Sequence, residues 1–232
     1  MSYEVQPIGY LRSCFKEKFA IPRQPALAPA ATAELTLIAP YNQAQSLAGL
    51  EQVSHVWLIF LFHQSLTDTP HLTVRPPRLG GNQSIGVFAS RATHRPNNIG
   101  QSVVKLERIN QHRLYFSGID LLDGTPILDI KPYVPYSDAI PTAQNLIAPE
   151  PPSLIAVSFS TNALAQAQAH AKRLQQPIVA LIEQCLAQDP KPAYQKPSPQ
   201  RIYGALFWDL NVTWHYPTAH SIHVLSVELA HH

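Results

Sequence analysis

Short apolar segments separated by proline and glycine fill the first 135 residues of the chain, and this punctuation constrains its fold more than any other feature. Segments with the composition of strands lie at 5–12, 34–38, 55–62, 84–90, 102–109, 113–121 and 126–134. Many short strands between turn residues are typical of a β-barrel or a β-sandwich. The chain is therefore predicted to be mainly β, with an amino-terminal barrel domain over residues 1–145.

Two local patterns add detail to this barrel. In the stretch SIGVFAS, Ile85, Val87 and Ala89 alternate with the residues between them, which predicts a strand with those three side chains on one face. Asp123 and Gly124 lie between two apolar runs. Because Asp-Gly tolerates the positive φ of tight turns, this pair predicts a β-hairpin.

A change of composition marks a second domain after the proline-rich stretch IAPEPPS at 147–153. The segment that follows is rich in Ala, Gln and Leu, which predicts two helices: Ser160 or Thr161 would cap the first, and Pro177 would lie in the first turn of the second. The last two segments, RIYGALFWDLNVTWHY and SIHVLSVEL, alternate as strands do. We therefore expect a small α+β carboxy-terminal domain over residues 150–232.

Targeting signals and membrane spans are not evident in the sequence. The apolar run VWLIFLF is flanked by His55 and His63 and is far shorter than the roughly 20 residues that cross a bilayer. The amino terminus lacks a basic region followed by an apolar one, so no secretory signal is expected. These observations predict a cytoplasmic protein with no membrane partner.

Cysteine and histidine spacing does not indicate a metal site. Cys14 and Cys185 lie far apart and form no CxxC pair, and nothing near either thiol marks an activated nucleophile. His55, His63 and His71 recur every eight residues, a pattern that metal ligands could share but that histidines at strand ends explain better. We expect no metal.

The distribution of charge is more informative than the net charge of +2. No Asp or Glu lies between Asp68 and Glu107. This gap contains five cations: Arg75, Arg78, Arg91, Arg95 and Lys105. Guanidinium groups bind phosphate or carboxylate oxygens through paired hydrogen bonds, so a cationic patch for RNA, a nucleotide or a carboxylate metabolite is predicted. The alternative is that these side chains are dispersed and solvated.

Two further patterns bear on the ligand. The residues Arg75 and Arg78 flank two prolines, and in an extended conformation with three residues per turn they would point the same way. Tyr41, and Tyr203 beside Arg201, offer groups that stack on single-stranded bases, although aromatic residues in strands more often serve packing. The common glycine-rich dinucleotide and phosphate motifs and the zinc-protease and hydrolase motifs are all missing.

Five blocks, in order along the chain, resemble the TsaA-like family of β-barrel tRNA methyltransferases. They are KEKFAIPRQPAL (16–27), LIAPYNQ (37–43), SHVWLIFLFHQ (54–64), RPPRLGG with GVFASRATHRPNNIG (75–81 and 86–100), and LLDGTPILDIKPYVPY (121–136). The stretch AQDPKPAY (187–194) and the final strands resemble the family's small carboxy-terminal domain. The resemblance thus extends over both expected domains.

This resemblance implies a homodimer that binds S-adenosylmethionine near the subunit interface. The implied substrate is threonylcarbamoyladenosine at position 37 of tRNA, 3′ of the anticodon in threonine tRNAs, whose N6 atom receives a methyl group. The carboxy-terminal domain would contribute to tRNA recognition. Two alternatives remain open: a non-catalytic RNA-binding or regulatory module, and a small-molecule methyltransferase on the same barrel.

Site residues follow from the same matching blocks. The cofactor-binding residues implied are Pro25, Ala26, Leu27, His63, Gln64, Arg91, Gln101, Gly124, Thr125, Pro126 and Ile127. The candidates for tRNA binding are Tyr41, Arg75, Arg78, Arg95 and Lys131, with Arg201 and Tyr203 as weaker ones. An arginine such as Arg91 suits the methionine carboxylate of the cofactor.

The implied methyl transfer requires help from the enzyme. The acceptor nitrogen lies between adenine and a carbonyl, so its lone pair is delocalised and it is a poor nucleophile. Positioning would supply much of the rate, and a general base could add roughly 10²- to 10⁴-fold. Asp129 and His63 are candidates for this base, but the sequence assigns the catalytic role to neither residue.

Overall fold

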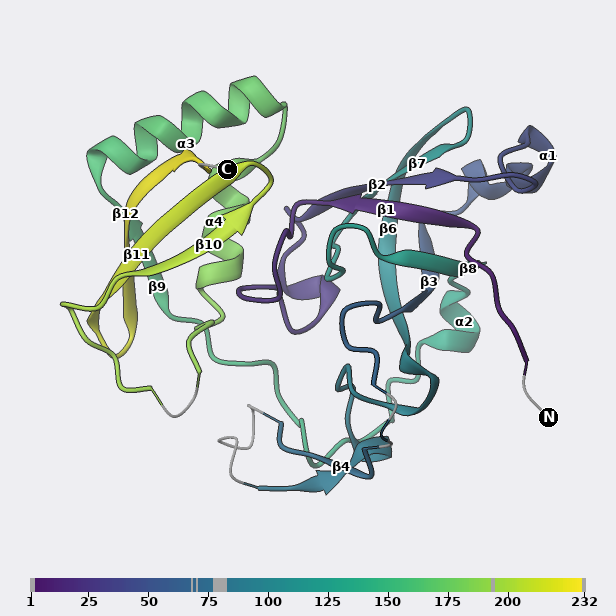
Figure 1. Cartoon of the computed structure of the whole chain (residues 1–232), viewed down its shortest axis with the longest axis horizontal. Helices are drawn as coiled ribbons and strands as arrows, with labels where there is room; N and C mark the ends of the chain where they lie inside the picture. The colour runs from purple at the N-terminus through teal and green to yellow at the C-terminus, as the bar shows by residue number, and fades with distance from the viewer. Residues whose placement is uncertain (1–2, 68, 70, 77–82, 193–194, 231–232) are drawn as a thin grey trace.

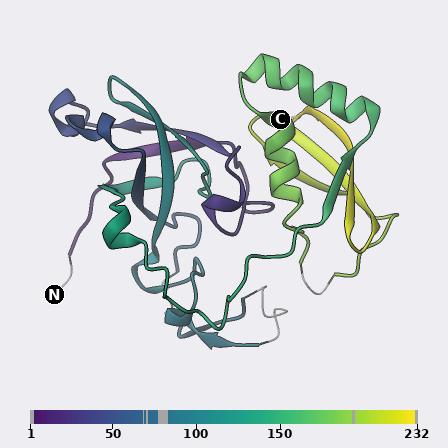
Figure 2. The same cartoon turned by 180° about the vertical axis from the view of Figure 1, so that it is seen from behind.

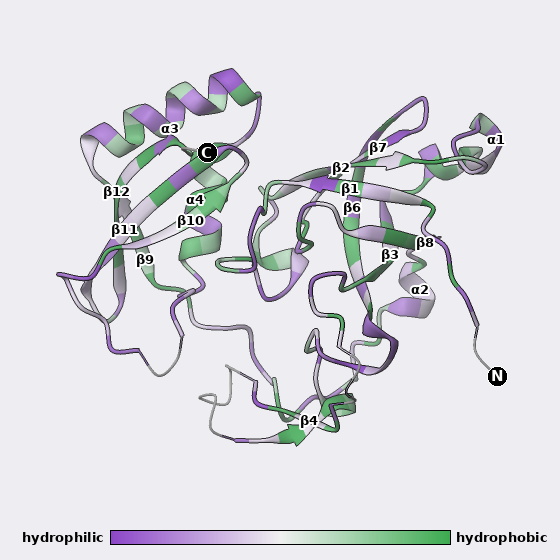
Figure 3. Ribbon diagram, in the orientation of Figure 1, coloured by the Kyte–Doolittle hydropathy of each residue, from purple (hydrophilic) through white to green (hydrophobic). Residues whose placement is uncertain are grey.

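The computed structural model describes residues 3–67, 69, 71–76, 83–192 and 195–230. Figure 1 shows two parts side by side, a barrel and a smaller carboxy-terminal sheet with helices packed against it. The expectation of a mainly β protein with a separate α+β carboxy-terminal domain is confirmed. Apolar segments concentrate on the strands of both parts and on the second long helix (Figure 3).

Six strands close the barrel in the order β1-β2-β7-β6-β3-β8. Their bounds are Gly9–Ser13 (β1), Thr32–Leu37 (β2), His55–Leu61 (β3), Ile99–Asn110 (β6), Arg113–Ser117 (β7) and Pro126–Pro132 (β8). All neighbours pair antiparallel, and buried residues alternate with more exposed ones along β1, β2 and β3. The period of two places side chains such as Leu35, Leu58 and Ile127 in the core.

Short elements connect these strands at both ends of the barrel. They are η1 (Pro25–Leu27), α1 (Ala44–Leu47), η2 (Leu50–Gln52), β4 (Thr73–Val74), β5 (Ile85–Gly86), η4 (Val87–Ala89), η5 (Pro96–Asn98) and α2 (Pro135–Asp138). The pair β4 and β5 forms a separate two-stranded sheet. This small sheet lies below the barrel in Figure 1.

The predicted hairpin at Asp123 and Gly124 is wrong, although the turn exists. Gly124 has φ +75°, as a tight turn requires. However, β7 and β8 do not pair, because β8 lies between β1 and β3. The turn instead bonds to the chain around the end of β1: Asp123 N donates to Phe15 O and Gly124 N to Leu11 O, each at 2.8 Å.

The predicted strand over SIGVFAS is also wrong beyond its first residues. β5 ends at Gly86, and η4 turns the chain away, so that Val87 is buried while Phe88 is 81% exposed. The partner strand β4 has only two residues and gives no ladder to continue. The Ser90 hydroxyl donates to Val87 O at 3.0 Å and closes the turn.

The carboxy-terminal sheet has the order β10-β11-β12-β9. Its strands are Ala156–Phe159 (β9), Tyr203–Phe207 (β10), Leu210–Thr218 (β11) and Ser221–Leu229 (β12), and its helices are Thr161–Leu174 (α3) and Ile178–Leu186 (α4). Ser160 caps α3, with its hydroxyl accepting from Ala163 N, as predicted. Pro177 is the N-cap of α4 rather than part of its first turn. The short parallel strand β9 was not predicted.

The carboxy-terminal domain holds the chain that follows β1. Trp208 N donates to Cys14 O at 2.7 Å, the rings of Phe15 and Phe207 meet edge to face at 6.0 Å, and Phe19 stacks on Trp214 at 5.9 Å. Seen from behind, the connection from α2 to β9 runs along the outside between the two parts (Figure 2). The segment 14–31 is therefore packed between the barrel and the second sheet.

Candidate active site

A cavity of about 780 Å³ lies beside the segment 14–31 and extends along the outer face of β3 and β6. Seven of the residues expected to bind the cofactor line it, and they come from separate stretches of the chain: Pro25, Ala26, His63, Gln64, Arg91, Gln101 and Thr125. A cavity of this size suits a small organic ligand. The structure thus brings most of the expected cofactor residues together.

The other expected cofactor residues do not line the cavity. Ile127 is fully buried in the barrel core and Pro126 pairs with β1. Gly124 lies nearer, since a β carbon there would be 3.8 Å from His63 Nε2. Leu27 ends η1, and its carbonyl accepts from Gln188 Nε2 at 3.4 Å.

Two glutamines of the carboxy-terminal domain hold the wall that carries η1. Gln188 is 4% exposed, and its Oε1 atom accepts from Arg23 N at 3.2 Å. The Oε1 atom of Gln184 accepts from Ala30 N at 2.8 Å. These bonds fix the backbone on both sides of Pro25 and Ala26. Sequence patterns gave no signal for them, because the contacts join residues more than 150 positions apart.

Aromatic rings form the apolar part of the cavity. Phe60 and Phe62 meet edge to face at 5.1 Å, and Gly100 leaves room for them, since a β carbon there would collide with the Phe60 ring. Trp57 lies further along, with Nε1 donating to Asp138 Oδ2 at 2.9 Å. The sequence indicated only a buried strand here, so these rings were missed as site residues.

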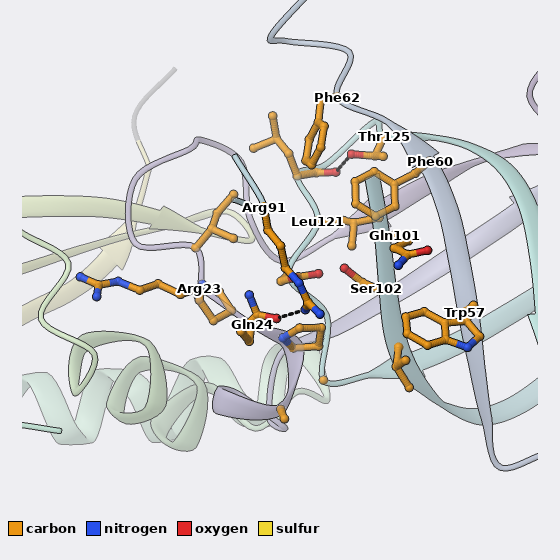
Figure 4. A pocket seen from close by; sticks show the side chains of 18 of the residues that line it. Arg23, Gln24, Trp57, Phe60, Phe62, Arg91, Gln101, Ser102, Leu121 and Thr125 are labelled. Atoms are coloured by element: carbon orange, nitrogen blue, oxygen red, sulfur yellow. Dashed lines mark hydrogen bonds between the residues drawn. The ribbon is translucent and has the colours of Figure 1, made fainter. Parts of the chain in front are cut away.

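Among the charged residues of the lining, cations outnumber acids. Figure 4 shows Arg91 reaching toward Gln24, to which its Nη1 atom donates at 2.6 Å, while Arg23 points away from this pair. Lys18 Nζ donates to Gln64 O at 2.6 Å and so joins two walls of the cavity. Lys105 also lines it. Such a site suits a ligand with a carboxylate or phosphate group.

Asp120 is one of two acidic residues of the lining, with Asp138, that sequence patterns did not indicate. It lines the cavity, and its Oδ1 atom is buried without a hydrogen-bond partner. Burial raises its pKa to about 6, against the opposing effects of the Ser102 hydroxyl and the Arg91 charge. No local pattern marks this aspartate, because the Asp-Gly turn signal lies three residues later, at Asp123.

The two residues considered for the general base are placed differently. His63 lines the cavity, and burial, followed by the charge of Lys18, lowers its pKa. Asp129 does not line the cavity. Its carboxylate accepts from Ile130 N at 2.9 Å and pairs with Lys131 at 2.9 Å. Of the two, only His63 lies where a ligand could meet it.

The candidates for tRNA binding among the described residues do not form one patch on a single chain. Tyr41 is exposed just before α1, and Arg75 is exposed just after β4. These two elements lie at opposite ends of the barrel in Figure 1. Arg95 Nη1 donates to Ser90 O at 3.0 Å and braces its own loop. Arg78 lies outside the described residues.

Tyr203 needs a correction. It is 7% exposed, packs against Trp214 and Tyr216, and donates from its hydroxyl to Gln195 Oε1 at 3.2 Å. Its ring is part of the carboxy-terminal core and has no face open to a base. Arg201 lies over the ring at 5.2 Å and is exposed, so it remains a candidate.

The described part of the chain shows no activated thiol, no metal-binding group and no membrane-spanning helix. Burial raises the pKa of Cys14 to about 12 and also raises the pKa of Cys185, so both thiols stay protonated. No group of three or more His, Cys, Asp or Glu side chains among the described residues could hold a metal ion. No helix in the described ranges is long and apolar enough to cross a membrane.

Comparison with known proteins covers both parts of the chain. Residues 10–139 match the family of tRNA-methyltransferase O N-terminal domains, and residues 152–230 match TrmO C-terminal domains. A putative S-adenosylmethionine-dependent methyltransferase from Pseudomonas aeruginosa is 66% identical over 227 residues, which cover 98% of each chain. The Escherichia coli tRNA (adenine(37)-N6)-methyltransferase is 46% identical over 92% of this chain and 93% of its own.

A solved structure resembles the whole chain as well. The crystal structure of TrmO from Pseudomonas aeruginosa aligns with a TM-score of 0.86 at 58% identity and covers 98% of both chains. At this level of identity the two chains share the arrangement of barrel and carboxy-terminal domain. The similarity therefore covers both domains that border the cavity.

Proposed function

The chain belongs to the TrmO family of S-adenosylmethionine-dependent tRNA (adenine-N6)-methyltransferases, and from this premise we propose that it methylates N6 of threonylcarbamoyladenosine at position 37 in threonine tRNAs. The observation that carries the proposal is the cavity in which Arg91, Gln101 and the η1 wall meet. The Escherichia coli relative, named for adenine 37, supports the position of the reaction.

The cavity fits S-adenosylmethionine in size and in chemistry. The Arg91 guanidinium suits the methionine carboxylate, and the backbone of η1 and of the Gly124 turn suits the adenine edge. Phe60 and Phe62 line an apolar region that excludes water from the methyl group. The cofactor supplies an electrophilic methyl group on a sulfonium, and the chain supplies orientation and a dry site.

The tRNA would meet the exposed side of this cavity. Lys18 and Lys105 line it and suit the phosphates beside the target nucleotide. Arg75 is exposed and directly follows β4 of the small sheet, and Lys131 borders a second hollow that shares Trp57 and Gln101 with the first. The carboxy-terminal domain would add Arg201 to this surface.

We also propose that the enzyme works as a cytoplasmic homodimer. Tyr41 lies just before α1 and Arg75 directly follows β4, two elements at opposite ends of one barrel in Figure 1, so a second chain would bring such groups together around one anticodon loop. Large apolar side chains on the connection between the domains remain exposed, including Tyr136 at 92% and Leu146 at 89%. A subunit contact would cover such residues.

The test is methyl transfer to tRNA from cells that lack the gene. Enzyme, bulk tRNA and S-adenosylmethionine with a labelled methyl group are combined, and the nucleosides are separated by mass spectrometry. We expect label on threonylcarbamoyladenosine and a loss of at least tenfold in Arg91→Ala. Label in a metabolite fraction instead of tRNA would indicate a small-molecule methyltransferase. Binding of tRNA without any binding of cofactor would indicate a non-catalytic module.

A further inference from the structure

Asp120 lies on the cavity wall in the stretch between β7 and the Gly124 turn. Its neighbours Ile119 and Leu121 are buried in the core. Ile119 N donates to Ala31 O at 3.2 Å, and Ser13 Oγ donates to Leu121 O at 2.7 Å. The carboxylate is therefore carried by a backbone that is fixed on both sides, which is what a positioned reacting group requires.

The Oδ1 atom of Asp120 has no hydrogen-bond partner among the described residues, although it is buried. A buried acceptor without a partner destabilises the folded state, and more so when it is charged. The other cavity acid does not share this state, because Asp138 Oδ2 accepts from Trp57 Nε1 at 2.9 Å and from Val134 N at 3.0 Å. Asp120 thus places on the cavity wall a carboxylate that the described residues do not fully satisfy, and a ligand in the cavity can supply a further donor.

We propose that Asp120 is the general base of the methyl transfer and that its donor is the N6–H group of the modified adenosine. This inference rests on the proposed function. The Asp120 carboxylate accepts the N6 proton, while the nitrogen lone pair forms the new N–CH₃ bond and the electrons of the C–S bond remain on sulfur. The products are the methylated nucleoside, S-adenosylhomocysteine and protonated Asp120, which then passes its proton to water.

The charged surroundings of Asp120 agree with this role. The Ser102 hydroxyl, the Asp120 backbone and the Arg91 guanidinium oppose the effect of burial on the pKa of the carboxylate. On this proposal Arg91 binds the carboxylate of the cofactor and Asp120 binds the N6–H group of the nucleoside, so each side chain contacts a different substrate. His63, the other titratable candidate in the cavity, lies beside Lys18 and is only partly buried. A base with a pKa of about 6 is ionised at neutral pH and still accepts a proton readily.

The test compares Asp120→Asn with the wild type and with Asp129→Asn, a carboxylate outside the cavity. Affinity for S-adenosylmethionine is measured by calorimetry, and kcat is measured with saturating cofactor and tRNA from pH 5 to 9. We expect Asp120→Asn to lower kcat by roughly 10²- to 10⁴-fold, to leave the cofactor Kd within threefold, and to abolish the rise in rate through pH 6. Asp129→Asn should keep that rise.

Other results would overturn the assignment in distinguishable ways. A loss of cofactor affinity of tenfold or more, with kcat retained at saturation, would show that Asp120 pairs with the cofactor's ammonium group. Unchanged kcat and pH profile would show that it takes no part. If the wild type binds the cofactor but methylates no tRNA, the proposed function itself fails. Circular dichroism and thermal unfolding of Asp120→Asn establish that any loss of rate comes from a folded protein.

Discussion

The two walls of the cavity are built in different ways. The wall formed by residues 14–31 is tied to the carboxy-terminal domain through buried aromatic rings and through Gln184 and Gln188. The described residues of the wall formed by residues 63–98 include a two-residue strand pair and short 3₁₀ turns, and Arg95 bonds to carbonyls of its own loop. One wall is tied to the core of the second domain, whereas the described residues of the other are joined to the first wall through Lys18 and Arg91.

The way each wall is held bears on which ligand it can bind. A small cofactor needs a fixed site, because every rotation lost on binding weakens its affinity. A tRNA loop can shape a flexible edge as it binds, since it contributes many phosphate contacts. We infer that the 14–31 wall, with Arg91 bonded to it from the facing wall, serves the cofactor and that the exposed edge around Arg75 serves the tRNA. The Phe207, Gln188 and Arg75 predictions below test this contrast, and the Asp120 prediction tests the acid of the lining that lies outside both segments.

The largest effect on stability is expected where the 14–31 wall packs against the core of the carboxy-terminal domain. Phe207→Ala removes the ring that contacts Phe15 and leaves a cavity between the two domains. It should lower the free energy of unfolding by about 3–5 kcal/mol. The matched control Phe88→Ala, on the other wall, removes a ring that is 81% exposed and should change it by less than about 0.5 kcal/mol. Urea denaturation of both variants measures the difference, and equal effects would contradict the contrast.

Asp120→Asn should stabilise the protein without ligand. Burial raises the Asp120 pKa from 3.8 to about 6, so the folded state keeps its proton at a pH where the unfolded state has lost it. The wild type therefore loses stability as the pH rises from about 4 to 6 and carries the full penalty above that, on the order of 2–3 kcal/mol. Thermal unfolding at pH 8 should show Asp120→Asn as the more stable protein. The gap should close near pH 4, and a gap that widens toward low pH would refute the burial effect.

Gln188→Ala should loosen the attachment of the 14–31 wall to the carboxy-terminal domain. It leaves Arg23 N without its acceptor and Leu27 O without its donor, which costs about 1–3 kcal/mol. Because η1 then loses its fixed position, affinity for S-adenosylmethionine should fall several-fold as well. Calorimetry and urea denaturation measure the two effects. Gln200→Ala, on an exposed loop, should change neither, and unchanged cofactor affinity in Gln188→Ala would show that η1 is held by other contacts.

The smallest effect on stability is expected on the tRNA side. Arg75→Ala changes an exposed side chain, so unfolding should be nearly unaffected. If Arg75 contacts a phosphate, the slope of log affinity for tRNA against log salt should become shallower by about 0.7 to 0.9. Filter binding at several salt concentrations measures it. A slope equal to the wild type's would remove Arg75 from the tRNA surface.

Local sequence patterns predicted the strands that have partners and failed where tertiary contacts decide. The barrel strands and the Ser160 cap follow from alternation and capping rules. The SIGVFAS strand failed because its neighbour β4 is too short to extend a ladder. The Asp123 hairpin failed because the turn bonds to the end of β1, a contact that no local pattern encodes.

The candidate site divides in the same way. Matching family motifs located the Arg91, His63 and Gln101 positions, which do line the cavity. Asp120 was missed because its importance lies in burial and in an unpaired oxygen, which only the folded chain reveals. Tyr203 was misplaced because an alternating strand does not say which of its faces is covered by another layer.

Calorimetric titration of the chain with S-adenosylmethionine, in the absence of tRNA, tests the central claim most directly. The account predicts binding of one cofactor per chain to the wild type, the same affinity in Arg75→Ala, and a loss of at least tenfold in Arg91→Ala. Binding that appears only when tRNA is present, or an Arg75→Ala variant as weak as Arg91→Ala, would contradict a cofactor site that is built before the tRNA arrives.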